Sequence, residues 1–394
     1  MISVFELLSS QLAERRRSRG MPGATRPRRT YRCQCGRPVF FNNSFCVGCQ
    51  ASLGFAPDLG EMRSMAPGPS ADEWVLSGPA GEAAAPGVWR RCANFHSAAC
   101  CNWLVRAEDA HVFCHSCRLT RTIPDLSRPE SAARWEKLEA AKRRLAAQLL
   151  ELKLPVVSRA DDPQHGVAFD FLETLPGGPR ILTSHADGLI TINAEEADDA
   201  IREKMRAEMR EPYRTLLGHF RHEIGHYYWD RLVEGTPWLE KFRHVFGDER
   251  ADYAAALEQN YHSGPPPDWA MRHVSAYASV HPWEDWAETW AHYLHIVDTI
   301  NTALGYGLGG NDVDFNSEPF AQDALYDPSH AQSGPFLALI NSWVELTAVL
   351  NELTRSMGQR DLYPFVLSKA AVAKLHFVHL VVSEAGEKAA AAER

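Results

Sequence analysis

The sequence predicts an α+β protein that is mainly helical, with a small β-hairpin or sheet in the helical part and a small cysteine-rich module before it. Three observations lead to this prediction. Cysteines recur in close pairs between residues 33 and 117, and two short β-prone runs flank an Asp-Gly pair within 181–193. The residues that follow are mainly helical in pattern. With 394 residues, the chain is expected to form two or three domains.

Composition indicates a soluble globular protein. Hydrophobic residues make up 45% of the chain and charged residues 23%, which is enough to bury a core. The net charge of -9 disfavours the whole chain as a binder of polyanions, although the first 32 residues are rich in arginine. No stretch approaches the roughly 18 apolar residues of a membrane span. The N-terminus does not read as a secretion signal. We therefore expect no membrane contact and a cytoplasmic location.

Changes in composition divide the chain. Residues 1–30 are expected to be a disordered basic tail, because they contain too few apolar positions to pack. Residues 31–125 are expected to form the cysteine module, with a flexible insertion at 57–88 where Pro, Gly and Ala are frequent. After Pro129 the pattern becomes helical, and this helix leads into a domain expected to span 130–385.

The run His-Glu-Ile-Gly-His at 222–226 carries the strongest chemical signal. A helix is expected over about 212–232, with a broad apolar stripe on one side and the histidines on the other. Residues four apart lie one turn above each other, so His222 and His226 can hold one zinc ion, with Glu223 beside it to polarise a water. A chance match to so short a pattern is the alternative interpretation.

A second predicted helix, opened by Pro282, presents a similar polar face. Glu284, Glu288, His292 and His295 fall on this face, opposite an apolar side rich in tryptophan. A solvated acidic face is the ordinary explanation for such a cluster. Because two faces of histidine and carboxylate occur within one domain, we interpret them as converging on the same metal ion.

A catalytic zinc site needs a third protein ligand and an open fourth position. Glu284 is the predicted third ligand, since it would lie in the first turn of the second helix. Glu288 is predicted to accept a hydrogen bond from a ligating histidine and so fix its tautomer. Asp285 is the nearest competitor for the ligand role. Three other acidic residues could also act as ligands, although salt bridges are favoured for them: Asp248, Glu249 and Asp252.

The cysteines form two sets at the spacing typical of structural zinc sites. The sets are Cys33, Cys35, Cys46 and Cys49, and Cys92, Cys101, Cys114 and Cys117, with Cys100 left over. Buried or redox-active thiols are the alternative, and the spacing leaves open how the cysteine pairs combine between the sets. Zinc would supply the folding energy that so short a segment cannot obtain from apolar burial.

Together these motifs resemble the bacterial family of zinc-binding metallopeptidases with an N-terminal zinc ribbon. The resemblance rests on the runs 219–230, 246–250 and 281–295, and it covers roughly residues 31–380. It implies a zincin-like catalytic domain of the peptidase class and leaves the substrate open. The pattern at 101–105 is similar to the family's ribbon, and this similarity favours Cys101 over Cys100 as a ligand.

A weaker similarity is to the anthrax lethal factor type of zincin. In that type a tyrosine, six residues and then Glu-x-x-Ala-Glu supply an oxyanion-side hydroxyl and the third ligand. Tyr277, six residues and then Glu284 to Glu288 repeat this arrangement, which implies those roles for Tyr277 and Glu284. Along the sequence, Glu284 lies farther from the two histidines than the third ligand does in that family. A packed aromatic residue with a surface hydroxyl is the alternative for Tyr277.

The sequence therefore predicts a zinc-dependent peptidase with one catalytic and two structural zinc ions, acting on proteins or peptides. Glu223 is expected to move protons and Tyr277 to stabilise the oxyanion. The strand expected at 189–193 is a hypothetical partner for an extended substrate. Two alternatives remain, a non-catalytic adaptor whose ribbons bind protein or nucleic acid, and a zinc hydrolase of a non-peptide amide. An intact Glu223 argues against the adaptor.

Overall fold

The computed structural model describes most of the chain. The described residues are 30–78, 85–175, 177–179, 181–209, 211–309, 313 and 317–392. The predicted basic tail, 1–30, lies outside this part of the chain except for Thr30. The described residues fold as two units: the cysteine unit, 30–151 with 155–209, and the helical unit, 152–154 with 211–392. In this division by contacts, the helix after Pro129 packs with the cysteine unit.

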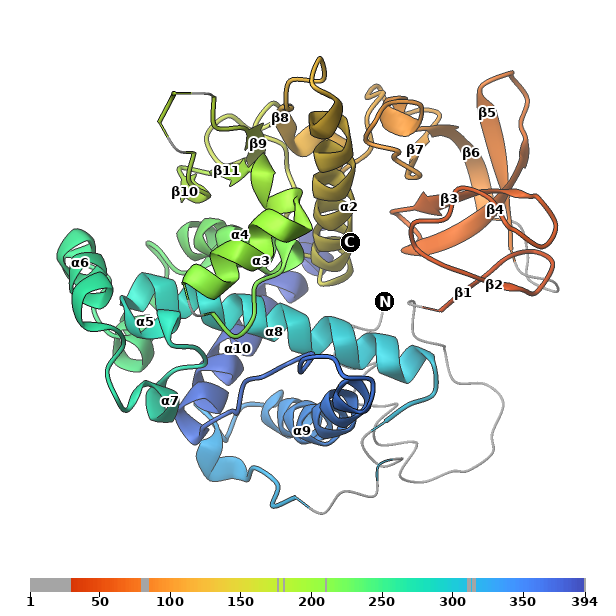
Figure 1. The fold of residues 1–394 in the computed structure, drawn as a ribbon. Helices are drawn as coiled ribbons and strands as arrows, with labels where there is room; N and C mark the ends of the chain where they lie inside the picture. The colour runs from red at the N-terminus through yellow and green to blue at the C-terminus, as the bar shows by residue number, and fades with distance from the viewer. Residues whose placement is uncertain are drawn as a thin grey trace. The chain divides into compact units, whose positions relative to one another are not determined.

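The first part of the cysteine unit is a meander of antiparallel strands (Figure 1). Its strands are β1 (Tyr31–Arg32), β2 (Pro38–Val39), β3 (Ser52–Ala56), β4 (Glu61–Pro67), β5 (Glu73–Ser77), β6 (Ala85–Arg91) and β7 (Leu104–Arg106). β1 pairs with β2, and β3 to β7 form one five-stranded sheet in sequence order. The Phe55 N–H donates to the Asn102 carbonyl at 3.0 Å, and Phe55 forms a bridge with Trp103. The two ends of the sheet therefore meet.

The expectation of a flexible insertion at 57–88 is wrong for its described residues. β4, β5 and the start of β6 lie within this segment. Met65, Leu76 and Trp89 are buried together and give these strands a common core. A Cβ at Gly68 would lie 2.8 Å from the backbone of Glu73, so glycine permits the close approach of β4 and β5 at their turn. The Pro and Gly content therefore reflects turns and close strand contacts.

The second part of the cysteine unit combines a mixed sheet with two helices. Its elements are β8 (Thr120–Thr122), α2 (Pro129–Glu151), β9 (Ala168–Leu172), β10 (Ser184–Ala186), β11 (Leu189–Asn193) and α3 (Asp199–Glu208). The strand order is β10-β11-β9-β8, with β11 antiparallel to β10 and β9 parallel to both of its neighbours. On α2, the predicted apolar face is buried, from Trp135 to Leu149.

The predicted hairpin is present, with a shifted first strand. Asp187 and Gly188 have φ angles of 48° and 75°, which is the backbone of a tight type I′ turn. The first strand occupies 184–186, whereas the sequence predicted 181–183. β11 lies between β10 and β9, so both of its edges are already paired. This pairing contradicts the hypothesis that β11 binds an extended substrate, because strand addition needs a free edge.

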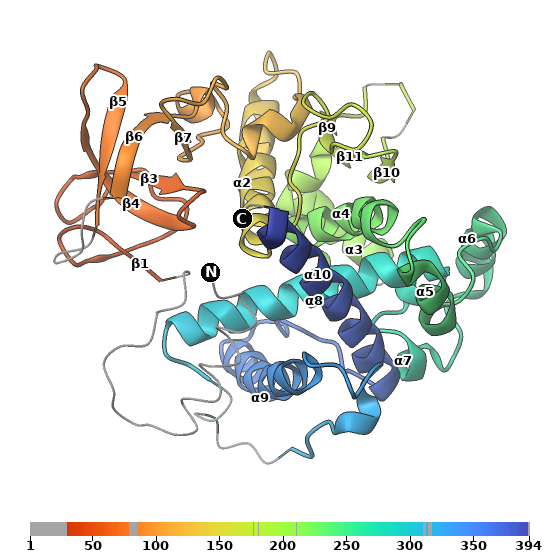
Figure 2. The same cartoon turned by 180° about the vertical axis from the view of Figure 1, so that it is seen from behind.

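The helical unit is arranged around the helix α8 (Pro282–Gly305). Its elements are α4 (Leu216–Leu232), α5 (Trp238–Phe246), α6 (Tyr253–Ser263), α7 (Trp269–Arg272), the short 3₁₀ helix η4 (Tyr277–Ser279), α8 (Pro282–Gly305), α9 (Ser333–Ser356) and α10 (Lys369–Ala392). α8 contacts α4, α5, α9 and α10. Figure 2 shows α10 crossing α8. Aromatic rings fill the contact regions, and the ring of Tyr228 stacks on that of Trp290.

α4 and α8 approach each other closely at Gly225. A Cβ at this position would lie 3.1 Å from the Ala287 Cα and 3.2 Å from the Trp290 Cβ. The indole N–H of Trp286 donates to the Gly225 carbonyl at 2.8 Å and fixes the crossing point. α4 begins at Leu216 and not near Pro212 as predicted, because the Thr215 hydroxyl caps it by accepting from the Gly218 N–H.

One helix among the described residues, α9, is long and apolar enough to cross a membrane by length and composition alone. The expectation that no segment approaches this limit is therefore corrected for α9. This helix contacts α8 and α10 and buries Phe336, Leu339 and Trp343. A core helix of a soluble protein passes the same length and composition test.

Candidate metal centres

Three side chains from α4 and α8 converge in the helical unit. The Nε2 atoms of His222 and His226 are 3.2 Å apart. The Glu284 Oε2 atom lies 3.0 Å from His222 Nε2 and 3.6 Å from His226 Nε2. His226 and Glu284 are buried, and His222 is partly exposed. The one-turn spacing of the histidines and the α4–α8 crossing at Gly225 together produce this arrangement.

These separations fit the donor set of a zinc ion. Zinc takes imidazole nitrogen and carboxylate oxygen at about 2.0–2.2 Å, so tetrahedral ligand atoms lie about 3.3–3.5 Å from one another. The three distances between the candidate ligand atoms, 3.0 to 3.6 Å, bracket this value. Three protein ligands leave the fourth tetrahedral position for water or substrate, as catalytic zinc sites require.

A second layer of hydrogen bonds orients His222. Its Nδ1 atom lies 2.8 Å from Glu288 Oε1, and the Ser275 hydroxyl donates to Glu288 Oε2 at 2.5 Å. A carboxylate at Nδ1 favours the tautomer that leaves Nε2 available as a ligand. Glu288 thus lies beside His222, a candidate ligand, and Ser275 adds one further residue to this series of hydrogen bonds.

The charges around the group favour a cation. Burial opposes protonation of His222, but Glu284 and Glu288 outweigh it and raise the pKa of His222 well above its usual value. Burial would raise the pKa of Glu284, yet the two imidazoles hold it well below its usual range. Burial dominates at His226, and its pKa is lowered. The two carboxylates thus stabilise positive charge between α4 and α8.

Glu223 and Tyr277 both lie in the helical unit near this group. Glu223 follows His222 on α4 and is 8% exposed, so little water reaches its carboxylate. The ring of Tyr277, in η4, lies 6.0 Å from the ring of His222. Burial and the Glu284 carboxylate raise the pKa of Tyr277, which keeps its hydroxyl protonated as a donor.

Asp285 does not join the group. Its carboxylate accepts from Lys374 Nζ on α10 at 2.5 Å and lies 3.0 Å from His273 Nδ1. Lys374 also donates to the Arg272 carbonyl at 2.8 Å. Asp285 is therefore committed to a buried ion pair, while the neighbouring Glu284 faces the histidines.

The other candidates from the sequence have structural partners. His292 Nδ1 contacts the Tyr363 hydroxyl at 2.5 Å, and His295 Nδ1 contacts Arg221 at 2.5 Å. The interpretation that both histidines converge on the metal is therefore wrong. The three remaining acidic residues make local contacts: Asp248 pairs with Arg250, Glu249 pairs with Arg243, and Asp252 caps α6 by accepting from the Ala255 N–H.

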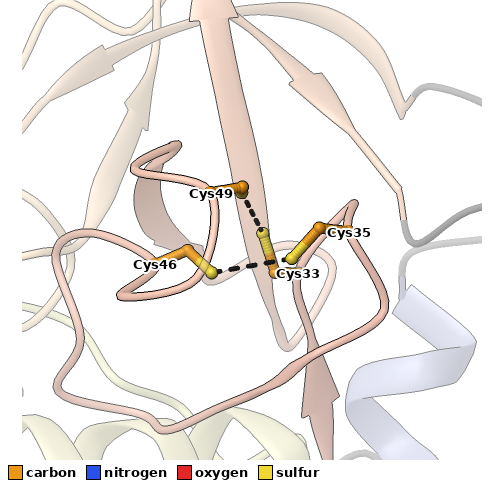
Figure 3. A group of neighbouring side chains, drawn as sticks. All are labelled: Cys33, Cys35, Cys46 and Cys49. Carbon is orange, nitrogen blue, oxygen red and sulfur yellow. Dashed lines mark hydrogen bonds between the residues drawn. The ribbon is translucent and has the colours of Figure 1, made fainter.

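The first cysteine set forms one compact group (Figure 3). Cys33 Sγ lies 3.5 Å from Cys49 Sγ, and Cys35 Sγ lies 3.8 Å from Cys46 Sγ. Zinc–sulfur bonds of about 2.3 Å place tetrahedral sulfur atoms about 3.8 Å apart. The four thiols therefore match the dimensions of a closed structural zinc site.

The second set is fully buried and contains Cys92, Cys101, Cys114 and Cys117. Cys101 Sγ lies 3.6 Å from Cys114 Sγ, so each set is complete without the other. Cys100 is exposed, and its sulfur contacts the Ser97 carbonyl at 3.7 Å instead. This geometry favours Cys101 over Cys100 as the ligand.

Arg143, on α2, supplies positive charge beside the second set. It is 3% exposed and donates to the Ala99 carbonyl at 3.0 Å. Burial opposes its charge, but Cys101 and other neighbouring acidic groups raise its pKa. A guanidinium here offsets the negative charge of four thiolates. This contact also explains why α2 belongs to the cysteine unit.

Comparison with known proteins identifies two regions of the chain. A family described as "Putative zinc-binding metallo-peptidase" matches residues 131–381, and a zinc-ribbon domain matches residues 30–128. The chain belongs to this metallopeptidase family. The resemblance seen in the sequence is thereby confirmed, including the ribbon that precedes the peptidase region.

Relatives of this family member occur in mycobacteria. Uncharacterized proteins of Mycobacterium bovis and of two strains of Mycobacterium tuberculosis are each 42% identical to it over 358 residues. The aligned region covers 90% of this chain and 96% of each relative. No solved structure gives a significant match.

Sequence reasoning missed two aromatic residues at the histidine group of this metallopeptidase-family chain. Trp283 lies over His226, with ring centroids 3.7 Å apart. The Tyr253 hydroxyl donates to Glu284 Oε1 at 2.7 Å. Trp283 directly precedes Glu284, so its position offered a signal. Tyr253 offered none, because its contact with Glu284 spans 31 residues of sequence.

Replacing Cys101 with Ser is expected to remove one zinc ion from this family member, whereas Cys100→Ser should remove none. The wild-type chain is expected to bind three zinc ions, one for each group. Cys101 belongs to a closed set of thiols and Cys100 does not. Elemental analysis of both variants measures the difference. Equal zinc loss, or loss only from Cys100→Ser, would refute the assignment of ligands in the second set.

Proposed function

We propose that the chain is a zinc-dependent peptidase of the zincin type, which hydrolyses peptide bonds in proteins or peptides with Glu223 as the general base. The observation that carries this proposal is the convergence of His222, His226 and Glu284 with a buried carboxylate, Glu223, next to the first histidine. Membership in the metallopeptidase family supports the same class of reaction.

The proposed mechanism assigns proton transfer to Glu223. When bound by His222, His226 and Glu284, zinc would acidify a water and polarise the scissile carbonyl. Glu223 takes a proton from the attacking water and delivers it to the leaving amine. Low exposure of Glu223 limits competition from bulk water for the transferred proton.

Two further contacts support catalysis in this proposal. The Tyr277 hydroxyl, kept protonated by its raised pKa, donates to the oxyanion that develops on the carbonyl. Glu288, held by Ser275, keeps the His222 ring in the orientation that presents Nε2. We place the activity in the cytoplasm, supported by nine cysteines that are all unpaired by disulfides.

Digestion of a peptide library by the full chain tests this proposal. Mass spectrometry should reveal cleaved peptide bonds in the library, and preincubation with a zinc chelator should abolish the cleavage. Adding zinc back should restore it. A zinc-loaded, folded chain that cuts no peptide but hydrolyses non-peptide amides would exclude the peptidase and favour a different hydrolase.

A further inference from the structure

The Glu284 carboxylate has two oxygens in different surroundings. Oε2 is buried and faces the imidazoles of His222 and His226 at 3.0 and 3.6 Å. Oε1 accepts a hydrogen bond from the Tyr253 hydroxyl at 2.7 Å. The tyrosine therefore distinguishes the two oxygens, because a hydrogen-bonded oxygen is held away from the position that the histidines share.

We propose that Tyr253 is a positioning residue that fixes Glu284 as a ligand through one oxygen, and thereby sets the metal affinity of the histidine group. The inference rests on the proposed zinc site. A carboxylate without a donor can turn about its last side-chain torsion and present either oxygen or both. A hydrogen bond to a ligating carboxylate restricts that rotation and stabilises its charge.

The start of α6 is held opposite Glu284 by His281. The His281 Nδ1 atom accepts from the Trp283 N–H at 3.1 Å, so Nε2 carries the proton and donates to the Ala251 carbonyl at 3.0 Å. His281 thus joins the N-terminus of α8 to the segment that enters α6. The rings of Tyr253 and His281 also meet edge to face, with centroids 5.4 Å apart. These contacts place Tyr253 against Glu284.

The location of Tyr253 separates this role from core packing. α6 contains no buried residue, and Tyr253 itself is 37% exposed. Removing the hydroxyl while keeping the ring preserves the edge contacts with His281 and Trp283. Tyr253→Phe should therefore remove the hydrogen bond to Glu284, together with the contact between the Tyr253 and Tyr277 hydroxyls, with little effect on the fold. Tyr261 lies on the same helix, is 69% exposed and provides a matched control.

The test compares Tyr253→Phe and Tyr261→Phe with wild type in the full chain. Competition with a zinc chelator gives the affinity of the histidine group, identified by its absence in Glu284→Ala. Loss of a hydrogen bond to a metal ligand is expected to weaken zinc binding by about 10- to 100-fold in Tyr253→Phe. Tyr261→Phe should match wild type. Cobalt(II) placed at the histidine group should show a visible spectrum in Tyr253→Phe that differs from wild type, since the ligand oxygens change.

The outcomes separate this inference from the proposed function. If wild type binds zinc at the histidine group and Tyr253→Phe has the same affinity and the same cobalt spectrum, the positioning role is refuted and the zinc site stands. If wild type binds no metal there, both are refuted. A lower melting temperature of metal-free Tyr253→Phe, with unchanged cobalt spectrum, would also refute the positioning role in favour of a structural one.

Discussion

Glu223→Gln is expected to lower peptide hydrolysis by about 100- to 10,000-fold while zinc content and melting temperature stay near wild type. Glutamine keeps the size of the side chain but cannot accept the proton from water. The loss corresponds to about 3–5 kcal/mol of transition-state stabilisation. Glu223 lies outside the three convergent ligand atoms, so the metal should be retained. Initial rates with equal amounts of folded, zinc-loaded protein measure the effect.

Glu234→Gln is the matched control, because Glu234 is exposed and directly follows α4 and its capping residue. Its hydrolysis rate should equal that of wild type. If Glu223→Gln loses zinc or stability, and its activity falls only in proportion to the folded fraction, Glu223 is structural. Wild-type rates in the folded, zinc-loaded variant would refute the general-base mechanism.

Asp285→Ala is expected to lower stability and Glu284→Ala to release zinc, although the two residues are neighbours on α8. Asp285→Ala leaves Lys374 buried without its partner, which should lower the free energy of unfolding by about 3–5 kcal/mol. Folded Asp285→Ala should keep its zinc. Glu284→Ala removes one of three convergent ligand atoms and should release the zinc of the histidine group.

Denaturant unfolding and zinc analysis of both variants separate these effects. The double variant Asp285→Ala, Lys374→Met should recover part of the lost stability, because it removes the unpaired charge. If Asp285→Ala loses zinc at unchanged stability and Glu284→Ala keeps it, Asp285 is the ligand. The assignment of Glu284 would then be wrong.

The histidine and cysteine groups were predictable because their chemistry is local in sequence. One helical turn places His222 and His226 together, and pairs such as Cys46 and Cys49 bring their sulfurs together within a short loop. The Asp187-Gly188 hairpin is local for the same reason, since its two positive φ angles suit these residues.

The other features of the candidate site could not be predicted, because they depend on contacts between segments that are distant in sequence. Glu284 and Asp285 are both acidic and adjacent, so the choice between them required Lys374, which lies 89 residues away. The polar face of α8 suggested that His292 would bind metal, but Tyr363, 71 residues away, takes its Nδ1 atom. The contact of Tyr253 with Glu284 could not be predicted from the sequence, because it depends on how the start of α6 packs near α8.

Composition was misleading at 57–88. A high content of Pro, Gly and Ala is typical of linkers, and it also occurs in short strands joined by tight turns. Met62, Met65 and Leu76 provide the apolar positions that hold these strands in the sheet. The polar residue Ser64 occupies a buried position of β4 between the two methionines, so the strand pattern was hidden in the sequence.

The proposed function requires that one zinc ion is bound by His222, His226 and Glu284. Anomalous diffraction at the zinc edge, on crystals of the full chain purified without added metal, tests it most directly. A peak is expected about 2.0–2.2 Å from both Nε2 atoms and from Glu284 Oε2, besides one peak in each cysteine group. Peaks in the cysteine groups alone, with none between α4 and α8, would contradict it.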